Sequence, residues 1–218
     1  MSAIAIRRII YSESLVVLIL SASIASESPT NLRVCVSSLR AQSLFTGTSP
    51  QSYSNLNVLT AIGYSAIIYV LCSLIPTAIP LNHGCLAPIK VIIPPCTILS
   101  PGLGATTVAG NVETSQQITD VMLKAFEACR ASQGTCNNLT FGYGGNSDSS
   151  VTKGFSYYET IAGGSGGGSN WDGQSGIHVH MTNTCIGDAE QIERKYPVIV
   201  CEFSIRTGSG GAGSTSWW

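Results

Sequence analysis

A run of apolar residues with helical spacing is the clearest pattern in the sequence. Six apolar side chains recur at intervals of three or four residues and share one face of a helix: Ile118, Val121, Met122, Ala125, Phe126 and Cys129. Thr114, followed by Gln117, matches a capping box, and Gly134 lies beyond the end of the pattern. The sequence therefore predicts a capped amphipathic helix over residues 115–131 that packs into the core.

A second predicted helix has almost no polar face. Residues 55–74 are nearly apolar all round, end before Pro76 and follow a turn at residues 46–50. Within this helix, the most apolar stretch contains several small or polar residues, whereas a transmembrane helix needs roughly 20 consecutive apolar residues. We therefore predict a largely buried helix and no membrane span.

Short runs typical of β-strands occupy much of the remaining sequence. They cover residues 90–93, 138–142, 155–161, 176–181 and 198–206. In the last run, alternate apolar residues share one face, and a short helix opened by Asp188 precedes it. Together these elements predict an α+β fold with a mixed or antiparallel sheet, a buried helix and a capped amphipathic helix.

Composition and charge narrow the classes of function. Charged residues form 11% of the chain, against about 25% in a typical soluble domain, and hydrophobic residues form 44%, so general disorder is excluded. The net charge is −1, which offers no basic surface for nucleic acid. Between Arg40 and Lys90 there is no charged residue at all. Such a stretch indicates a face covered by more chain or by a partner.

The eight cysteines include no C-x-x-C pair, which argues against a zinc ribbon or a redox motif. Cys72 and Cys129 fall on apolar helical faces, where a thiol packs as a small apolar group. We therefore expect reduced cysteines and a cytoplasmic protein. Residues 1–26, however, have the layout of a secretory signal peptide. If they act as one, the chain is secreted, the cysteines can form disulfides, and Asn138 begins a glycosylation acceptor.

Two histidines are the strongest candidates for acid–base chemistry. His178 and His180 are two residues apart in a predicted strand, which would put both imidazoles on one face. Glu159 and Asp172 could complete a catalytic group with them. Two histidines without a placed third ligand do not define a metal, so its identity stays open. The alternative is that these groups only hydrogen-bond one another.

Glycines are concentrated between residues 142 and 176, where eleven occur. Glycine allows the backbone to approach a ligand closely, so N–H groups in this stretch could face a substrate carbonyl or carboxylate. Ser165 fits the G-x-S-x-G pattern, but in so glycine-rich a stretch the match is weak evidence for a nucleophile. There is no P-loop for ATP. The expected substrate-binding residues are Gly163, Gly164, Asn183, Glu113 and Gln116.

The most specific feature is a set of short strings in a fixed order. They include residues 45–50, 79–88, 109–116, 157–164 and 178–184. In this order, and from about residue 45 to residue 213, they resemble the hydantoinase B/5-oxoprolinase family, and most closely the C-terminal part of the large fungal-type members. The resemblance implies a partial hydantoinase B-type domain at residues 44–213, an unmatched segment at residues 1–43 and a truncated tail at residues 214–218.

The resemblance implies an amide-ring hydrolase. It implies a small cyclic amide as substrate, 5-oxo-L-proline, opened to L-glutamate at the expense of ATP in glutathione metabolism. It also implies that a hydantoinase A-type portion or subunit, absent from these residues, handles ATP with Mg²⁺. Whether copies of the chain form a homo-oligomer is left open.

Departures from the family pattern weaken the case for activity. Gln117 stands where the pattern has Arg, and Cys185 and Gly187 stand where it has Arg and Thr. An Arg fork binds carboxylates in a bidentate way that neutral side chains cannot reproduce. We therefore expect the chain alone to be inactive. Two alternatives stay open: a non-catalytic remnant or assembly module of the same fold, and a secreted disulfide-containing protein.

Overall fold

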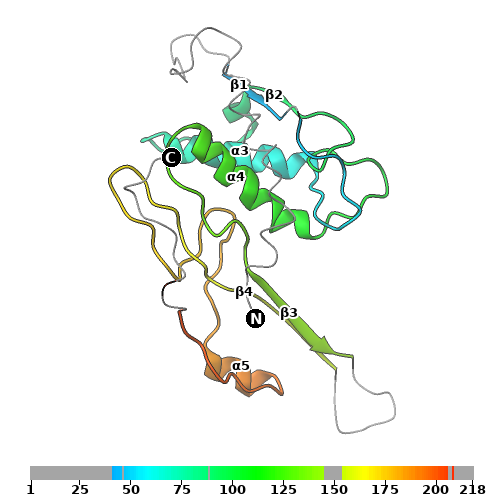
Figure 1. Cartoon of the computed structure of the whole chain (residues 1–218), viewed down its shortest axis with the longest axis vertical. Helices are drawn as coiled ribbons and strands as arrows, with labels where there is room; N and C mark the ends of the chain where they lie inside the picture. The colour runs from blue at the N-terminus through cyan, green and yellow to red at the C-terminus, as the bar shows by residue number, and fades with distance from the viewer. Residues whose placement is uncertain (1–40, 46, 88, 145–153, 206–207, 209–218) are drawn as a thin grey trace. The chain divides into compact units, whose positions relative to one another are not determined.

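The computed structural model describes residues 41–45, 47–87, 89–144, 154–205 and 208 (Figure 1). The chain divides into two compact units, residues 1–129 and residues 130–218. The first unit contains β1 (Ala41–Leu44), α3 (Thr60–Leu74), η1 (His83–Leu86), β2 (Ile89–Ile92), η2 (Ala109–Asn111) and α4 (Thr114–Ala125). The second contains β3 (Asn138–Tyr143), β4 (Phe155–Thr160) and α5 (Ala189–Lys195). This is an α+β fold, as predicted.

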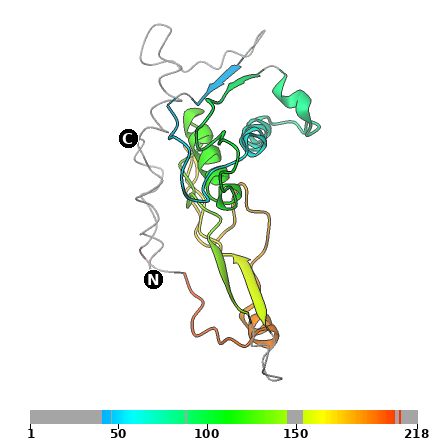
Figure 2. The ribbon, with the colours of Figure 1, turned by 90° about the vertical axis from the view of Figure 1, so that its right-hand side faces the viewer.

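The core of the first unit lies between α3 and α4, which pack against each other (Figures 1 and 2). The core side chains are apolar and at most 9% exposed, and include Val58, Ala66, Ile67, Val70, Leu99, Ile118, Val121 and Met122. Both predicted helices are therefore present. The first is shorter than predicted and is buried on one face only, because Ser65 and Leu74 are exposed.

A turn organised by one asparagine delays the start of α3 until Thr60. Asn57 is fully buried, and its Oδ1 accepts from the Ser52 N–H at 2.8 Å. Its Nδ2 donates to the carbonyl oxygens of Ser52, Ser54 and Thr106 at 2.9, 3.0 and 3.0 Å. These hydrogen bonds fix the chain before the helix in a loop, which is why the predicted helical start at residue 55 is wrong.

The N-terminus of α4 does not form the predicted capping box. Thr114 is the first helical residue, and its hydroxyl donates to the Leu56 carbonyl at 2.5 Å. Glu113 is the N-cap, and its side chain makes no capping hydrogen bond. Thr114 therefore fastens α4 to the loop before α3.

The C-terminus of α4 lies at Ala125, six residues before the predicted end. Glu127 has a φ of 53°, the left-handed conformation. Its N–H donates to the Lys124 carbonyl at 2.9 Å, and the Ala128 N–H donates to the Leu123 carbonyl at 3.0 Å. This is the Schellman pattern that closes helices. The position usually holds Gly, and a Glu there gave no stop signal in the sequence.

Strand pairing produces two separate two-stranded sheets in the described part of the chain. β1 and β2 are parallel, from Ala41 opposite Ile89 to Leu44 opposite Ile92. β3 and β4 are antiparallel, from Asn138 opposite Thr160 to Tyr143 opposite Phe155. The strands predicted near residues 90–93, 138–142 and 155–161 are therefore present, but they do not join in one sheet.

An aromatic cluster connects the β3–β4 hairpin to the end of α5. The Tyr196 ring lies 5.2 Å from the Tyr157 ring and 5.8 Å from the Phe155 ring, and Phe141 lies 4.9 Å from Tyr157. Asp188 caps α5 as predicted, because its Oδ1 accepts from the Glu190 N–H at 3.3 Å. Aromatic packing and this cap together position α5.

Two predicted strands are wrong. Residues 176–181 form a loop with a turn at its end, and residues 198–205, the described part of the last predicted strand, form no strand either. Alternating side chains do not make a strand without a neighbouring backbone to complete the ladder. In the second segment, Ile199, Phe203 and Ile205 are at least 63% exposed.

Two further features of the described residues concern membrane spans and the state of the cysteines. In the part of the chain that the structure describes, no helix is long and apolar enough to cross a membrane. The seven cysteines of that part are free thiols, with Cys136 buried, and Cys35 lies outside it. The signal-like residues 1–26 also lie outside the described residues.

Candidate functional site

The predicted site residues divide between the two units. Glu113 and Gln116 lie at the start of α4 in the first unit. The others lie in the second unit: Glu159, Gly163, Gly164, Asp172, His178, His180 and Asn183. In the second unit they occupy β4, the glycine-rich segment at residues 163–168 (the glycine segment) and the loop that follows.

The glycine segment runs between two other stretches of extended chain. On one side, the Arg130 N–H donates to the Gly167 carbonyl at 2.8 Å. On the other, the Ser165 N–H donates to the Gln174 carbonyl at 2.9 Å, and the Gly176 N–H donates to the Gly163 carbonyl at 2.8 Å. Backbone hydrogen bonds thus hold three segments side by side.

Close packing explains why this segment is so rich in glycine. A Cβ added at Gly166 would lie 1.9 Å from the Arg130 carbonyl oxygen, and one added at Gly164 would lie 2.7 Å from the Gln174 carbonyl oxygen. Any side chain at these positions would push neighbouring backbone away. The Gly164 N–H is also engaged within the protein, since it donates to Gln133 Oε1 at 2.8 Å. The glycines therefore serve close backbone packing.

Gln133 is a residue of this region that the sequence analysis did not single out. Besides accepting from Gly164, its side chain donates through Nε2 to the Thr135 carbonyl at 2.9 Å. A Cβ on Gly163 would lie 2.7 Å from Gln133 Cδ, so the amide lies directly over this glycine. The sequence did not single out Gln133, because a lone glutamine matches no motif and has no spacing pattern.

Glu159 is half-buried on β4 and is held by two hydrogen bonds. Its Oε2 accepts from the Tyr157 hydroxyl at 3.0 Å and from the Gly187 N–H at 3.2 Å. Burial first, and then the Glu159 carboxylate, raise the pKa of Tyr157 to about 12. The tyrosine therefore remains a hydrogen-bond donor at neutral pH. A Cβ at Gly187 would approach Glu159 Oε2 to 2.9 Å, so the glycine leaves room for the carboxylate.

The two histidines do not share a strand face, contrary to the prediction. The segment that carries them is a loop, and His180 has a φ of 53°, which breaks the alternation of side chains. Both residues are half-buried. Neither ring nitrogen of His178 has a hydrogen-bond partner among the residues that the structure describes, although both nitrogens are shielded from solvent. Burial lowers the pKa of His180, which favours a neutral imidazole.

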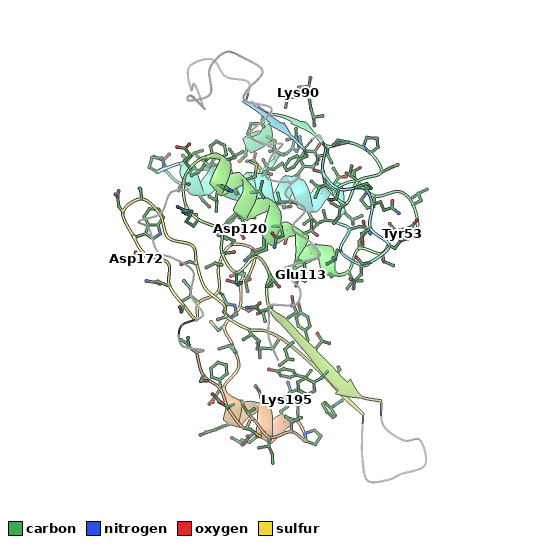
Figure 3. All side chains as sticks on the ribbon, in the orientation of Figure 1. Tyr53, Lys90, Glu113, Asp120, Asp172 and Lys195 are labelled. Atoms are coloured by element: carbon green, nitrogen blue, oxygen red, sulfur yellow. The ribbon has the colours of Figure 1, made fainter. Side chains whose placement is uncertain are left out.

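The remaining candidates differ in exposure. Asp172 and Asn183 are exposed, and Figure 3 shows Asp172 in the loop after the glycine segment. Gln116 is completely buried in α4, and Glu113 is half-buried at the start of that helix (Figure 3). Within the described ranges, no group of three or more His, Cys, Asp or Glu side chains could hold a metal ion. Among its described residues, the second unit packs the glycine segment closely against Gln133 but forms no three-ligand cluster.

Comparison with known proteins shows which family the chain belongs to. The hydantoinase B/oxoprolinase family matches residues 5–216, and the chain therefore belongs to it. A 5-oxoprolinase of Saccharomyces cerevisiae is 54% identical over 178 residues, which cover 78% of this chain. A 5-oxoprolinase of Dictyostelium discoideum is 52% identical over 169 residues, again 78% of this chain. The resemblance found in the sequence is confirmed.

The match to these relatives is limited to a small part of their length. The chain spans 14% of the Saccharomyces protein and 13% of the Dictyostelium protein. A protein of Methanocaldococcus jannaschii is 36% identical over 189 residues, which cover 84% of this chain and 32% of that protein. No solved structure shows a significant match. The family match also extends into residues 1–43, the segment that sequence analysis had left unmatched.

Proposed function

We propose that this chain is a portion of an ATP-dependent, cytoplasmic 5-oxoprolinase-type hydrolase. The whole enzyme would open 5-oxo-L-proline to L-glutamate in glutathione metabolism. The supporting observation is the identity of 52–54% to two proteins named 5-oxoprolinase over 78% of the chain. A hydantoinase A-type portion would supply the site for ATP with Mg²⁺, because this sequence contains no P-loop.

The ring-opening reaction needs proton transfer at two atoms. Water adds its oxygen to the ring carbonyl carbon, the carbon–nitrogen bond breaks, and the nitrogen leaves as the amine of glutamate after taking up a proton. A neutral imidazole can accept the proton of water and later return one to the nitrogen. Because burial favours neutral His180 and His178 has two shielded nitrogens, we assign this proton transfer to these histidines.

The main support for this assignment is that both ring nitrogens of His178 are shielded from solvent. A buried polar group without a hydrogen bond costs free energy, and most such groups in proteins have partners. A substrate amide would be a suitable partner for one nitrogen. Asp172 and Asn183, both exposed, are the proposed contacts to the substrate's polar groups. Glu159 acts as a positioning residue, because Tyr157 and Gly187 already engage its carboxylate.

The roles of the other candidates follow from their surroundings. Gly163 and Gly164 lie beneath Gln133. Because glycine has no side chain, they would contact the substrate only through their backbone N–H and C=O groups. Glu113 and Gln116 are proposed as weaker substrate-binding residues at the start of α4. The nature of any metal is left open in this proposal.

Substitution of the histidines tests the proposed chemistry. The suitable protein is the Saccharomyces cerevisiae 5-oxoprolinase in which residues 45–213 of this chain replace the matching segment (the chimera). We expect His178→Ala in the chimera to lower kcat/KM at least about 100-fold, the usual effect of losing a general acid or base. His83→Ala is the matched control, because His83 is exposed in η1. Unchanged kcat/KM in both His178→Ala and His180→Ala, with intact folding, would remove these residues from the chemistry.

The isolated chain is expected to have no ATP-dependent ring-opening activity. It contains no P-loop, and Gln117 and Cys185 replace residues that are Arg in the family pattern. The measurement is glutamate release from 5-oxoproline with ATP by the purified 218-residue chain. Glutamate formation in proportion to ATP hydrolysed would contradict this prediction.

A second candidate function is a non-catalytic assembly module of the same fold. The observation that favours it is a set of exposed apolar side chains within the stretch that lacks charge, namely Leu59, Leu74, Ile75, Ile79 and Leu81. Such residues would pack against another hydantoinase-type portion or another copy. A chimera that folds and assembles but has no activity would favour this function. A secreted, disulfide-containing protein has no support from the free thiols described above.

A further inference from the structure

The loop that carries the two histidines, residues 176–184, is attached to the β3–β4 hairpin through side-chain hydroxyl groups. The Thr182 hydroxyl donates to the Cys136 sulfur atom, with an oxygen–sulfur distance of 3.1 Å. The hydroxyls of Thr184 and Thr160 are hydrogen-bonded to each other. Cys136 lies just before β3, and Thr160 is the last residue of β4. Both attachments therefore lie at the end of the hairpin where the chain enters β3 and leaves β4.

Thr182 also closes the turn that contains His180. Its N–H donates to the Val179 carbonyl oxygen at 3.1 Å, which makes residues 179–182 a β-turn with His180 at the second position. The φ of 53° at His180 is a conformation that side chains other than glycine keep only where the surrounding structure holds them. Through its backbone and its side chain, Thr182 therefore connects the conformation of His180 to the hairpin.

Burial makes the contact between Thr182 and Cys136 difficult to replace. Cys136 is 3% exposed, so solvent has almost no access to its sulfur atom, and Thr182 is half-buried. Sulfur is a weak acceptor, but a shielded hydroxyl that loses its acceptor incurs a desolvation cost. Separation of the two side chains is therefore unfavourable, and the turn stays beside the start of β3.

We propose that Thr182 is a positioning residue for His180, because its hydrogen bond to Cys136 holds the turn in the place that proton transfer requires. This inference rests on the proposed function, in which His178 and His180 transfer the protons of ring opening. Nε2 of His180 and both ring nitrogens of His178 are shielded from solvent. A shift of the turn would change that environment and move the imidazole away from the reacting atoms.

The first test follows the imidazole signals of the full chain by NMR as the pH is varied. The chain has three histidines, so few signals need to be assigned. Burial lowers the pKa of His180. In Thr182→Val, which removes the hydroxyl but keeps the shape of the side chain, we expect the pKa of His180 to rise, because a displaced imidazole becomes hydrated. Thr182→Ser keeps the hydroxyl and should leave the pKa of His180 lowered.

Cys136→Ala removes the acceptor of the same hydrogen bond. It should raise the pKa of His180 by the same shift as Thr182→Val, and the double variant should raise it no further, because both changes remove one contact. Thr140→Val is the matched control, since Thr140 is exposed on β3, and it should leave His180 unchanged. The His83 signal, from the first unit, should be the same in every variant. An unchanged titration of His180 in either single variant that folds would overturn the proposal.

A second test, in the chimera, separates this inference from the proposed function. Thr182→Val should lower kcat at least about 10-fold, and Thr182→Ser should recover most of it. If His178→Ala and His180→Ala leave kcat/KM unchanged, the proposed chemistry is wrong, and the NMR titration still decides whether Thr182 holds His180 in place. If the histidine substitutions lower kcat/KM but Thr182→Val keeps the kcat of the chimera, the positioning role of Thr182 is wrong.

Discussion

Replacement of Gly166 by Ala is expected to destabilise the protein by at least about 3 kcal/mol, among the larger effects of a single substitution. The added Cβ would lie 1.9 Å from the Arg130 carbonyl oxygen and 2.8 Å from that of Ala131. Both neighbours are backbone, so neither can rotate away. The Arg130–Gly167 hydrogen bond would lengthen or break as the segments separate. Chemical denaturation of the full chain measures the effect.

Gly144→Ala is the matched control for that substitution. No atom lies within 4 Å of a Cβ placed at this exposed glycine. The same chemical change there should leave stability unchanged or raise it by about 0.5 kcal/mol, because Ala reduces the entropy of the unfolded chain. Equal effects of the two substitutions would show that the glycine segment is not closely packed.

Replacement of Asn57 by Ala is expected to cost about 3 kcal/mol through a different mechanism. The side chain is fully buried and takes part in four hydrogen bonds with Ser52, Ser54 and Thr106. The amide has only two N–H groups for its three acceptors, so these contacts amount to about three full hydrogen bonds at roughly 1 kcal/mol net each. The same measurement of chemical denaturation reports this loss.

Asn55→Ala is the control for Asn57, since Asn55 is an exposed residue of the same type in the same loop. It should change stability by no more than about 0.5 kcal/mol. Hydrogen exchange gives a local readout, because the Ala109 and Gly110 N–H groups donate to the Asn55 carbonyl. Protection at these two amides should fall in Asn57→Ala and persist in Asn55→Ala. Unaltered protection in both variants would contradict the role given to Asn57.

Local patterns were sufficient to predict much of the fold. The apolar spacing from Ile118 to Ala125 identified α4, and a short run typical of a β-strand at residues 155–161 identified β4. The apolar spacing of a helix records directly which of its faces is buried. Asp188 likewise indicated the start of α5, because a cap acts within the first turn of its helix.

Backbone conformation at two residues explains two of the wrong predictions. Glu127 and His180 both have positive φ, which non-glycine residues rarely adopt and which no residue pattern announces. Glu127 ended α4 early, and His180 turned a predicted strand into a loop. Thr114 was correctly placed at the helix start, but its partner proved to be Leu56, a contact between residues far apart in sequence.

The candidate site was also predicted only in part, because local sequence patterns do not record contacts between residues far apart in the sequence. The density of glycine led us to expect that the backbone approaches a ligand in this segment, because the sequence does not show which other segments of the chain pack there. The structure shows neighbouring backbone at Arg130 and Gln174. Gln133 was overlooked because a lone glutamine carries no spacing signal, and its importance depends on contacts to Gly164 from another segment.

Glutamate formation by the chimera tests the central claim, that this chain is a working portion of a 5-oxoprolinase-type enzyme. The chimera and the unmodified Saccharomyces cerevisiae protein would be assayed in parallel with 5-oxoproline, each with and without ATP. We expect the chimera to release glutamate in proportion to the ATP hydrolysed, at a lower rate than the parent because Gln117 and Cys185 stand where the resemblance to the family predicts Arg. A chimera that folds and hydrolyses ATP but releases no glutamate would contradict the claim.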